Sequence, residues 1–328
     1  MMNTDYEWLV VGLIGGVLID VIFGDPSNKY HPVSWSGITI GFFIKKSKNS
    51  KLGSKHEKFL GAAFALVFVM LTWLSTQTLV YVLLHLFGII VSIIAGAMIL
   101  KVTIAIKGME KHVLKIVNAL QADDIVAARR NLSLIVRRDT LGLDRQFILS
   151  ATIECIGEST VDGIIGPLFF YSILGPAGSF AYRIINTLDS MLGYTTHYYQ
   201  NIGWMSAWLD TAVNYVPARI TSYLIVVSSL ISRADWKQSI KILCKDHKNT
   251  VSHNAGYPMA AMAGALRIKL EKIDHYSLGE NSEPLSIEKC WMALFIMKVT
   301  TVLFLIVLSI PVILILYMIG WWKFIFGI

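Results

Sequence analysis

Residues 59–106 read FLGAAFALVFVMLTWLSTQTLVYVLLHLFGIIVSIIAGAMILKVTIAI, an almost wholly apolar run that decides the fold. A helix needs about 20 apolar residues to cross the hydrocarbon core of a bilayer. This run is therefore long enough for two crossings. We expect two helices, 59–82 and 85–106, that pack as a hairpin and turn near Leu83–Gly88.

Further apolar runs lie on both sides of this hairpin. Trp8–Phe23 is predicted to be a retained first span and not a cleaved signal peptide, because it has no basic leader and no small-residue cleavage site. Residues 291–320 form the last strong span, where Pro311 is expected to introduce a kink. Residues 164–181 are interrupted by glycine and proline, and 220–232 are short. We expect re-entrant or interfacial segments at both places.

The composition agrees with a membrane protein. Hydrophobic residues make up 55% of the 328 residues, charged residues only 16%, and the mean hydropathy is +0.58. The net charge of +7 does not indicate nucleic-acid binding, because the basic residues lie between the apolar runs and there set membrane orientation. The lysine-rich loop 25–58 and the basic region 107–290 are both predicted to be cytoplasmic, which leaves both termini outside.

These observations predict the fold class. We expect an all-α, polytopic transmembrane protein that forms a single domain over residues 1–328, with polar helices on the cytoplasmic side and broken or re-entrant segments.

The first polar group follows the first span. It comprises Asp20, Gly24-Asp25-Pro26 and His31-Pro32-Val33. An ionisable residue near the membrane is a candidate for function. The alternative is a helix end whose polar side chains reach the interface, followed by an ordinary Gly-Asp-Pro turn.

The second polar group is acidic. Arg138 and Asp139 precede Glu154, Glu158 and Asp162, and the last three are spaced by four residues, which places them on one face of a regular helix. Carboxylate oxygens are the ligands that Mg²⁺ prefers. A magnesium site and a solvated acidic stripe both explain this spacing.

The third polar group combines arginine, amide and carboxylate side chains. It comprises Arg183, Asn186, Asp189, Asp210, Asn214 and Arg219. The arginines are suited to bidentate phosphate binding, although buried structural arginines give the same pattern.

The fourth group is the turn Asn254-Ala255-Gly256-Tyr257-Pro258, which precedes a helix of small residues. Such a turn can bind an anion through its backbone N–H groups, and it is equally typical of tight helix packing. The chain has no P-loop, no dinucleotide-binding glycine motif and no HExxH, so the standard forms of those enzymes are not expected.

In chain order, the motifs are Gly24-Asp25-Pro26, His31-Pro32-Val33, Arg138-Asp139-Thr140, Glu158-Ser159-Thr160-Val161-Asp162-Gly163, Tyr182-Arg183, Asn186-Thr187-Leu188-Asp189-Ser190, Pro217-Ala218-Arg219 and Asn254-Ala255-Gly256-Tyr257-Pro258. Together they resemble the CobD/CbiB family of cobalamin biosynthesis, the adenosylcobinamide-phosphate synthases. The resemblance extends from about residue 12 to residue 280.

The resemblance implies a multi-pass enzyme of the cytoplasmic membrane whose active face is cytoplasmic. Such an enzyme joins adenosylcobyric acid to (R)-1-aminopropan-2-ol or its O-phosphate through an amide bond. ATP is expected to activate the carboxylate as an acyl phosphate, with Mg²⁺ to offset phosphate charge. The lipid bilayer is a further partner, and other late corrin-pathway membrane enzymes are candidates for partners.

The resemblance also implies site residues, which are expected to converge in one pocket at the inner face of the membrane. The predicted metal ligands are Glu154, Glu158, Asp162 and Asp139. The predicted substrate and phosphate ligands are Arg138, Arg183, Arg219, Asn186, Asn214 and Asn254. The catalytic candidates are Asp189, His31 and Asp25, with Asp189 or His31 as the general base.

The chain departs from the family pattern at a few positions. Met259 stands where a glutamate is expected, Thr211 where a second aspartate is expected, and His253 where a proline is expected. Two other functions are compatible with a membrane protein of this kind: a non-enzymatic relative of the AmpE type that acts in signalling, and a transporter for a corrinoid or another solute.

Overall fold

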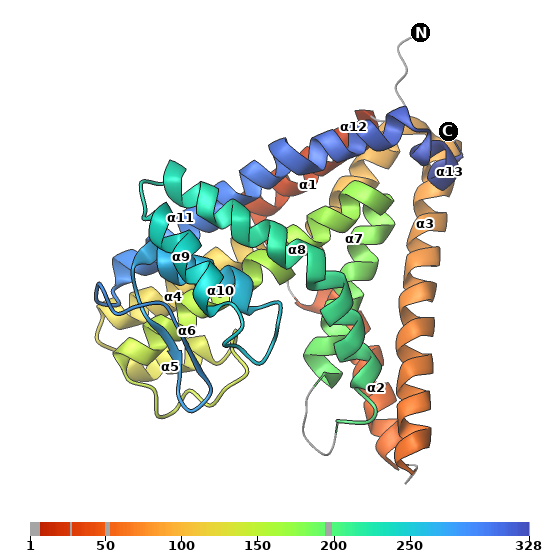
Figure 1. Ribbon diagram of the computed structural model, residues 1–328. Helices are drawn as coiled ribbons and strands as arrows, with labels where there is room; N and C mark the ends of the chain where they lie inside the picture. Colours follow the sequence, from red (N-terminus) through yellow and green to blue (C-terminus); the bar gives the residue numbers. More distant parts are fainter. Residues whose placement is uncertain (1–6, 27, 50–52, 194–198, 328) are drawn as a thin grey trace. The chain divides into compact units, whose positions relative to one another are not determined.

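The computed structural model describes residues 7–26, 28–49, 53–193 and 199–327. Helices dominate (Figure 1). In chain order the elements are α1 (Glu7–Phe23), η1 (Asn28–Tyr30), α2 (Pro32–Asn49), α3 (Ser54–Lys101), α4 (Ile106–Gln121), α5 (Ile125–Leu132), α6 (Arg145–Thr160), η2 (Val161–Ile165), α7 (Gly166–Leu192), α8 (Trp204–Ile231), α9 (Trp236–Asp246), α10 (Gly256–Leu266), β1 (Leu270–Lys272), β2 (Tyr276–Leu278), α11 (Ile287–Phe304), η3 (Leu305–Ser309), α12 (Ile310–Met318) and α13 (Trp321–Phe326).

Three helical stretches are long and apolar enough to cross a membrane: Ser54–Gln121, Arg145–Leu192 and Ile287–Met318. Many apolar side chains of α3 are not covered by the rest of the protein; for example, Val67 is 55% exposed and Met70 is 60% exposed. Exposing so large an apolar surface to water is energetically unfavourable, whereas contact with lipid is not. The predicted all-α membrane fold is therefore confirmed.

The chain divides into two compact units, each described by itself. Unit 1 comprises the described parts of Met1–Ala105, Gly166–Asn214 and Leu308–Ile328. Unit 2 comprises Ile106–Ile165 and Tyr215–Val307. This division does not test the expected single domain over residues 1–328. The single domain and the individual membrane spans therefore stay predictions.

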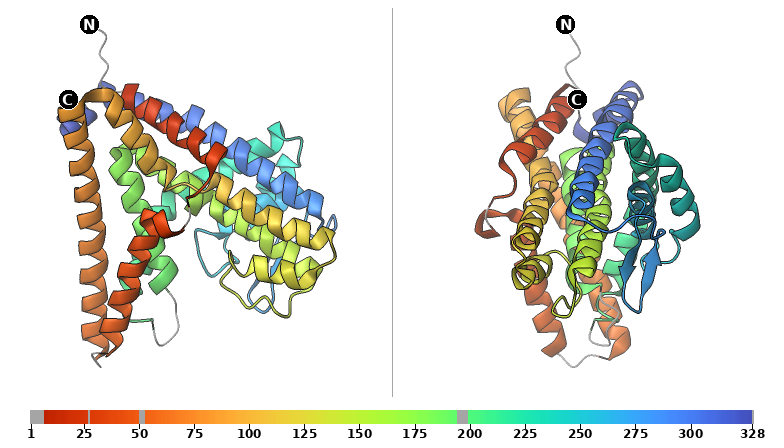
Figure 2. Two further views of the ribbon diagram at one scale, coloured as in Figure 1. Left: turned by 180° about the vertical axis from the view of Figure 1, so that it is seen from behind. Right: turned by 90° about the vertical axis from the view of Figure 1, so that its left-hand side faces the viewer.

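In unit 1, α3 consists of two arms that meet at Gly88, where φ is +80° and only glycine is comfortable. Figure 2 (left) shows the long arm turning sharply into a second arm, which continues beside α1. The break lies within the turn expected near Leu83–Gly88. The second arm ends at Lys101, five residues before the expected end at Ile106.

The predicted break in residues 164–181 also occurs. Helix α7 loses helical geometry at Gly175, where φ is +69°, directly before Pro176. The core of unit 1 joins α2, α3 and α7 through buried apolar side chains, among them Ile40, Ala65 and Leu188.

Most of the apolar segment 220–232 belongs to the 28-residue helix α8, which begins at Trp204 and ends at Ile231, and its re-entrant or interfacial placement stays a prediction. The part of α8 before residue 220 carries Asp210, Asn214 and Arg219, so its average hydropathy is lower although it belongs to the same helix. A hydropathy run therefore underestimates a helix with one polar face.

Unit 2 packs α4, α5, α6, α9, α10 and α11 with a two-stranded antiparallel hairpin, in which Leu270 pairs with Leu278. Every residue of α10 except the partly buried Tyr257 is buried. A Cβ on Gly264 would lie 2.4 Å from the carbonyl oxygen of Gln238, so glycine permits the close contact between α10 and α9. This contact favours helix packing as the role of the small-residue helix.

Candidate functional site

Asp25 lies at the centre of a charged group in unit 1. Helix α1 ends at Gly24, where φ is +68°, and the chain then places Asp25 beside His31 and Lys101. The His31 Nε2 and the Lys101 Nζ each lie 3.6 Å from the Asp25 Oδ1. Lys101 is only 4% exposed, so its charge is held almost entirely within the protein.

The hydrogen bond at the other ring nitrogen of His31 indicates its tautomer. The backbone N–H of Val33 donates to the His31 Nδ1 at 3.3 Å. With Nδ1 as acceptor, a neutral His31 carries its proton on Nε2, which faces Asp25. In this arrangement His31 acts as a donor toward Asp25 and not as a base at that nitrogen.

The surroundings of Asp25 lower the pKa of its carboxyl. Burial alone would raise that pKa. The hydrogen bond from His31 and the positive charge of Lys101 outweigh the burial, and the charge of Arg183 adds a smaller contribution in the same direction. Asp25 is therefore an anion at neutral pH.

Arg183 lies on α7, so its effect on the pKa of Asp25 relates the loop after α1 to that helix. One turn further along α7, the Asn186 amide oxygen accepts from the Arg183 Nη1 at 3.5 Å, and its amide nitrogen donates to the Asp210 Oδ1 of α8 at 3.5 Å. The buried Nε of Arg183 has no hydrogen-bond partner among the described residues. A buried donor of this kind needs a partner that the described side chains do not supply.

Asp189 and Asn214 extend the polar set of unit 1. A Cβ on Gly193 would lie 1.9 Å from the Asp189 Oδ1, so the carboxylate of Asp189 rests directly against the end of α7. The Asn214 amide oxygen accepts from the Tyr182 hydroxyl at 2.6 Å, and Asn214 is 1% exposed. Asn214 is thus a buried packing partner of α7.

A second charged group lies in unit 2 and is centred on Glu154. Its Oε2 accepts from the Arg138 Nη2 at 3.0 Å and from the Tyr276 hydroxyl at 2.9 Å, while its Oε1 accepts from the Ser150 hydroxyl at 2.7 Å. Ser150 in turn accepts from the backbone N–H of Glu271 at 2.8 Å. Glu154 therefore fastens the hairpin to α6.

Tyr276 keeps its proton in this network. Burial raises the pKa of its phenol, and the negative charge of Glu154 raises it further. The hydroxyl is thus a stable donor to the carboxylate over the physiological range.

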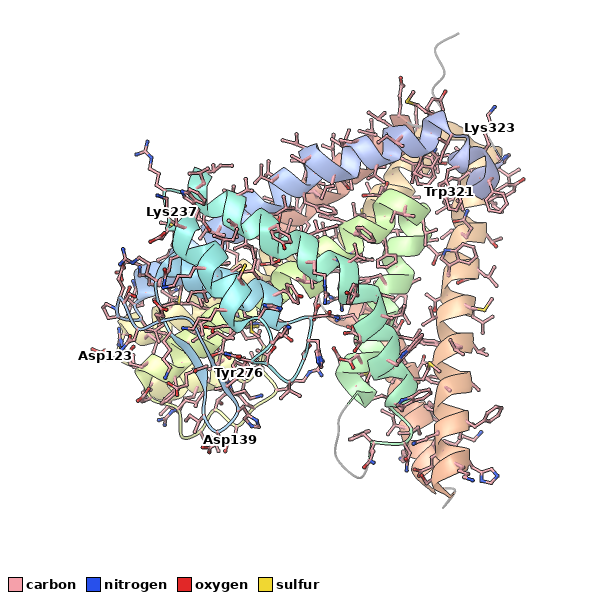
Figure 3. The ribbon with its side chains drawn as sticks, viewed as in Figure 1. Asp123, Asp139, Lys237, Tyr276, Trp321 and Lys323 are labelled. Carbon is pink, nitrogen blue, oxygen red and sulfur yellow. The ribbon has the colours of Figure 1, made fainter. Side chains whose placement is uncertain are left out.

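The four predicted metal ligands lie in different surroundings. No three His, Cys, Asp or Glu side chains are grouped for a metal ion within the described part of the chain. Glu154 is buried in its ion pair, Glu158 is exposed, and Asp139 lies in the exposed loop between α5 and α6 (Figure 3), where it accepts from the backbone N–H of Leu141 at 2.9 Å. Asp162 lies in the π-helical turn η2.

The helix changes its repeat at the last of these residues. The prediction places Glu158 and Asp162 on one face because an α-helix repeats every 3.6 residues. Asp162 instead lies in a π turn, whose hydrogen bonds span five residues. Among the described residues no cluster suited to magnesium is formed, so the four metal ligands stay a prediction and no reaction step is assigned to magnesium.

Arg219 belongs to unit 2, where two aromatic rings enclose it. Its guanidinium carbon lies 3.5 Å from the ring centroid of Tyr215 and 4.4 Å from that of Tyr257. Its Nη1 donates to the amide oxygen of Asn254 at 3.2 Å. The predicted pair Arg219 and Asn254 is therefore in direct contact.

Two residues of these groups escaped the sequence analysis. Lys101 had a usable signal, since a lysine at the end of a long apolar helix needs a partner. Tyr276 had none, because its contact with Glu154 depends on how a distant hairpin folds back. The prediction that the polar residues of both units meet in one pocket stays a prediction.

A sequence model of a protein family described as "CobD/Cbib protein" matches residues 13–297. The chain is 39% identical over 282 residues to the "Cobalamin biosynthesis protein CobD" of Dehalococcoides mccartyi, a match that covers 85% of this chain and 89% of that protein. It is also 39% identical over 267 residues to the protein of the same description from Clostridium perfringens, covering 81% and 84% of the two chains. No solved structure matches the chain.

Proposed function

This chain belongs to the CobD/CbiB family, whose members act in cobalamin biosynthesis, and from that membership we propose that it forms the amide bond between adenosylcobyric acid and 1-aminopropan-2-ol or its phosphate. The observation that carries the proposal is the set of contacts in unit 1. There Asp25, His31, Arg183 and Asn186, all within family motifs, lie in one hydrogen-bonded and charged group with Lys101.

The reaction joins a carboxylate and an amine with loss of one oxygen from the carboxylate. That oxygen is a poor leaving group, so the carboxylate must first be activated. ATP would supply a phosphoryl group for this purpose, and the oxygen would then leave as phosphate. The amine must give up a proton before or during attack.

The residues of unit 1 suit these demands. Arg183 and Lys101 are two cations that both act on Asp25, and we assign to Arg183 the binding of an anionic carboxylate or phosphate. Asp189 is our choice as the base, since the Nδ1 of His31 is already occupied by the Val33 amide. The Asp25–His31 pair would then position the loop that covers the anion.

In this proposal the reaction occurs at the cytoplasmic membrane, on its cytoplasmic face, where ATP is available. The basic segments 25–58 and 107–290 support that orientation.

Reconstituted protein tests the proposal. The purified chain in nanodiscs receives adenosylcobyric acid, ATP and either form of the amine, and mass spectrometry follows the corrinoid. We expect a product heavier by the amine minus water, and phosphate release only when both substrates are present. Asp189→Asn should lower kcat by about a hundredfold or more, the usual range for loss of an acid–base group.

The exposed hairpin residue Asp274 provides the matched control, and Asp274→Asn should leave the rate unchanged. An inactive wild-type protein that also fails to complement a synthase-deficient strain fed cobyric acid would contradict the proposal. Transport of the corrinoid without amide formation would instead support a transporter.

A further inference from the structure

Helix α9 of unit 2 presents three different faces. Its buried face, which includes Ile242, packs against α10 (Figure 1), and the hydroxyl of Ser239 donates there to the carbonyl of Ala261 at 2.8 Å. The exposed side of α9 divides into an apolar stripe and a basic stripe. No residue of either stripe is among the predicted site residues.

The apolar stripe comprises Trp236, Ile240 and Cys244. They are spaced by four residues, so their side chains lie in one row along the helix. All three are exposed. An exposed indole and an exposed isoleucine in one row form a surface that is unfavourable in water and favourable against lipid.

The basic stripe lies beside the apolar one, because consecutive residues are about 100° apart around a helix. It comprises the exposed Lys237, Lys241 and Lys245, and Lys248 follows in the turn after α9. The carboxylate of Glu280 accepts from the Nζ of Lys241 at 3.2 Å and from that of Lys245 at 3.4 Å. Lys237 and Lys248 form no ion pair within the described part of the chain, so the stripe keeps a net positive charge.

The junction between α8 and α9 is fixed by hydrogen bonds. The backbone N–H of Ala234 donates to the carbonyl of Ser229 at 2.8 Å, and the Oδ1 of Asp235 caps α9 by accepting from the N–H of Gln238 at 2.9 Å. Directly before this junction α8 also exposes apolar side chains, at Tyr223, Val227, Leu230 and Ile231. The two stripes therefore follow an exposed apolar helix end in the chain, and α9 cannot turn about its axis without losing its packing on α10.

We propose that α9 lies on the surface of the membrane, where its basic stripe binds the anionic headgroups of phospholipids and Trp236 and Ile240 contact the outer part of the acyl chains. A helix that carries an apolar row next to a basic row is suited to this interface. The positive charge selects anionic over neutral headgroups. An acidic partner protein would also offset the lysines, but the apolar stripe and the exposed end of α8 favour lipid.

A probe at Cys244 tests this placement in the full chain. A nitroxide on its thiol reports on α9, because Cys155 and Cys290 are buried. The labelled protein is placed in nanodiscs of phosphatidylcholine, either alone or mixed with phosphatidylglycerol. Electron paramagnetic resonance then measures collisions of the probe with oxygen, which enters lipid, and with a nickel chelate, which stays in water. With phosphatidylglycerol we expect more collisions with oxygen and fewer with nickel, and high salt should reverse this change by screening the charges.

Two double variants complete the test. Lys237→Gln with Lys248→Gln removes the lysines that have no ion pair. In phosphatidylglycerol this variant should lower the ratio of membrane-embedded to water-exposed probe about thirtyfold, since each lysine near an anionic surface contributes about fivefold. Lys111→Gln with Lys115→Gln removes the same charge from the exposed surface of α4. It is the matched control and should behave like wild type.

Two outcomes would overturn the proposal. In the first, the probe stays accessible to the nickel chelate in both lipid mixtures, which would leave the basic stripe available to an acidic partner protein. In the second, the probe is embedded equally in both mixtures and the lysine substitutions change nothing, which would show contact with lipid without recognition of the headgroup. Neither readout requires synthase activity, so the result does not depend on the proposed function.

Discussion

At the scale of single residues, charge pairing inside a mostly apolar chain decides which side chains can act. Lys101 and Asp25 offset each other, and Arg138 and Glu154 do the same in unit 2. An isolated charge in either place would carry a large desolvation cost. In the first pair Asp25 is partly exposed to solvent, whereas both side chains of the Arg138–Glu154 pair are largely buried.

Replacing Lys101 with methionine tests the first pair. The variant removes the cation that lowers the pKa of Asp25, so that pKa should rise. Because the wild-type pKa is lowered, Asp25 stabilises the folded state above the ordinary carboxyl range and loses this contribution as pH falls through its folded value. In Lys101→Met the folded pKa lies closer to the ordinary carboxyl value, so the loss should be smaller and should be complete at a higher pH.

Thermal unfolding in nanodiscs, measured from pH 3 to pH 7, checks this shift, together with the acid limb of the rate profile. Lys101→Arg keeps the charge and should stay close to wild type. An unchanged pH dependence in Lys101→Met would show that the lysine does not act on Asp25.

Substitutions in the Glu154 network distinguish two roles of Glu154, as a member of an ion pair or as a metal ligand. Glu154→Gln leaves the Arg138 charge without its partner, and breaking a buried pair costs about 3–5 kcal/mol. Tyr276→Phe removes one hydrogen bond and should cost about 1 kcal/mol. Chemical unfolding of each variant and of the double variant measures the coupling between the two side chains.

The exposed Glu158 provides the comparison, since Glu158→Gln should change stability little. A stable Glu154→Gln variant whose activity needs more Mg²⁺ would instead favour the metal site that the spacing predicted.

At the scale of helices, two glycines break long helices for the same backbone reason but in different surroundings. Gly88 and Gly175 both have positive φ with extended ψ, a region that only glycine occupies readily. No atom lies within 4 Å of a Cβ built on Gly88, whereas a Cβ on Gly175 would lie 2.8 Å from the ring of Phe326.

Alanine at these two glycines should therefore have unequal effects. Gly88→Ala adds only backbone strain, about 1–3 kcal/mol. Gly175→Ala adds the same strain and also displaces Phe326, which packs edge-on against Trp8 with ring centroids 5.0 Å apart. We expect the larger fall in unfolding temperature for Gly175→Ala. Gly142→Ala, with open space and an ordinary φ, should unfold like wild type; equal effects at Gly88 and Gly175 would contradict the packing argument.

The sequence predicts those features of the fold and the site that depend on a single helix or loop. The turn near Gly88, the break at Gly175 and the grouping of Asp25 with His31 in the first polar group all depend on residues close together in the chain. The extent of α8, the π turn at Val161–Ile165 and the contact of Tyr276 with Glu154 do not. The first depends on a polar helix face, the second on a change of helical repeat, and the third on a contact between residues far apart in the chain. Hydrophobic periodicity predicts none of these.

At the scale of the whole molecule, the distribution of charge predicts which polar segments share a compartment. The loop after α1 and the loops of unit 2 are basic, and basic segments are retained in the cytoplasm. The charged groups around Asp25 and Glu154 should then face the same side of the membrane, whereas Lys323 near the C-terminus should face the other. A shared compartment is necessary if both groups serve one reaction.

Single-cysteine labelling in intact cells tests this topology. The background is Cys244→Ser, because Cys244 is exposed and Cys155 and Cys290 are buried. A cysteine placed at Lys29 or at Asp274 should react with an impermeant maleimide only after the membrane is opened, and one at Lys323 should react at once. Labelling of Lys29→Cys and Asp274→Cys from opposite sides would separate the two charged groups. The roles proposed for unit 1 would then have to stand without any residue of unit 2.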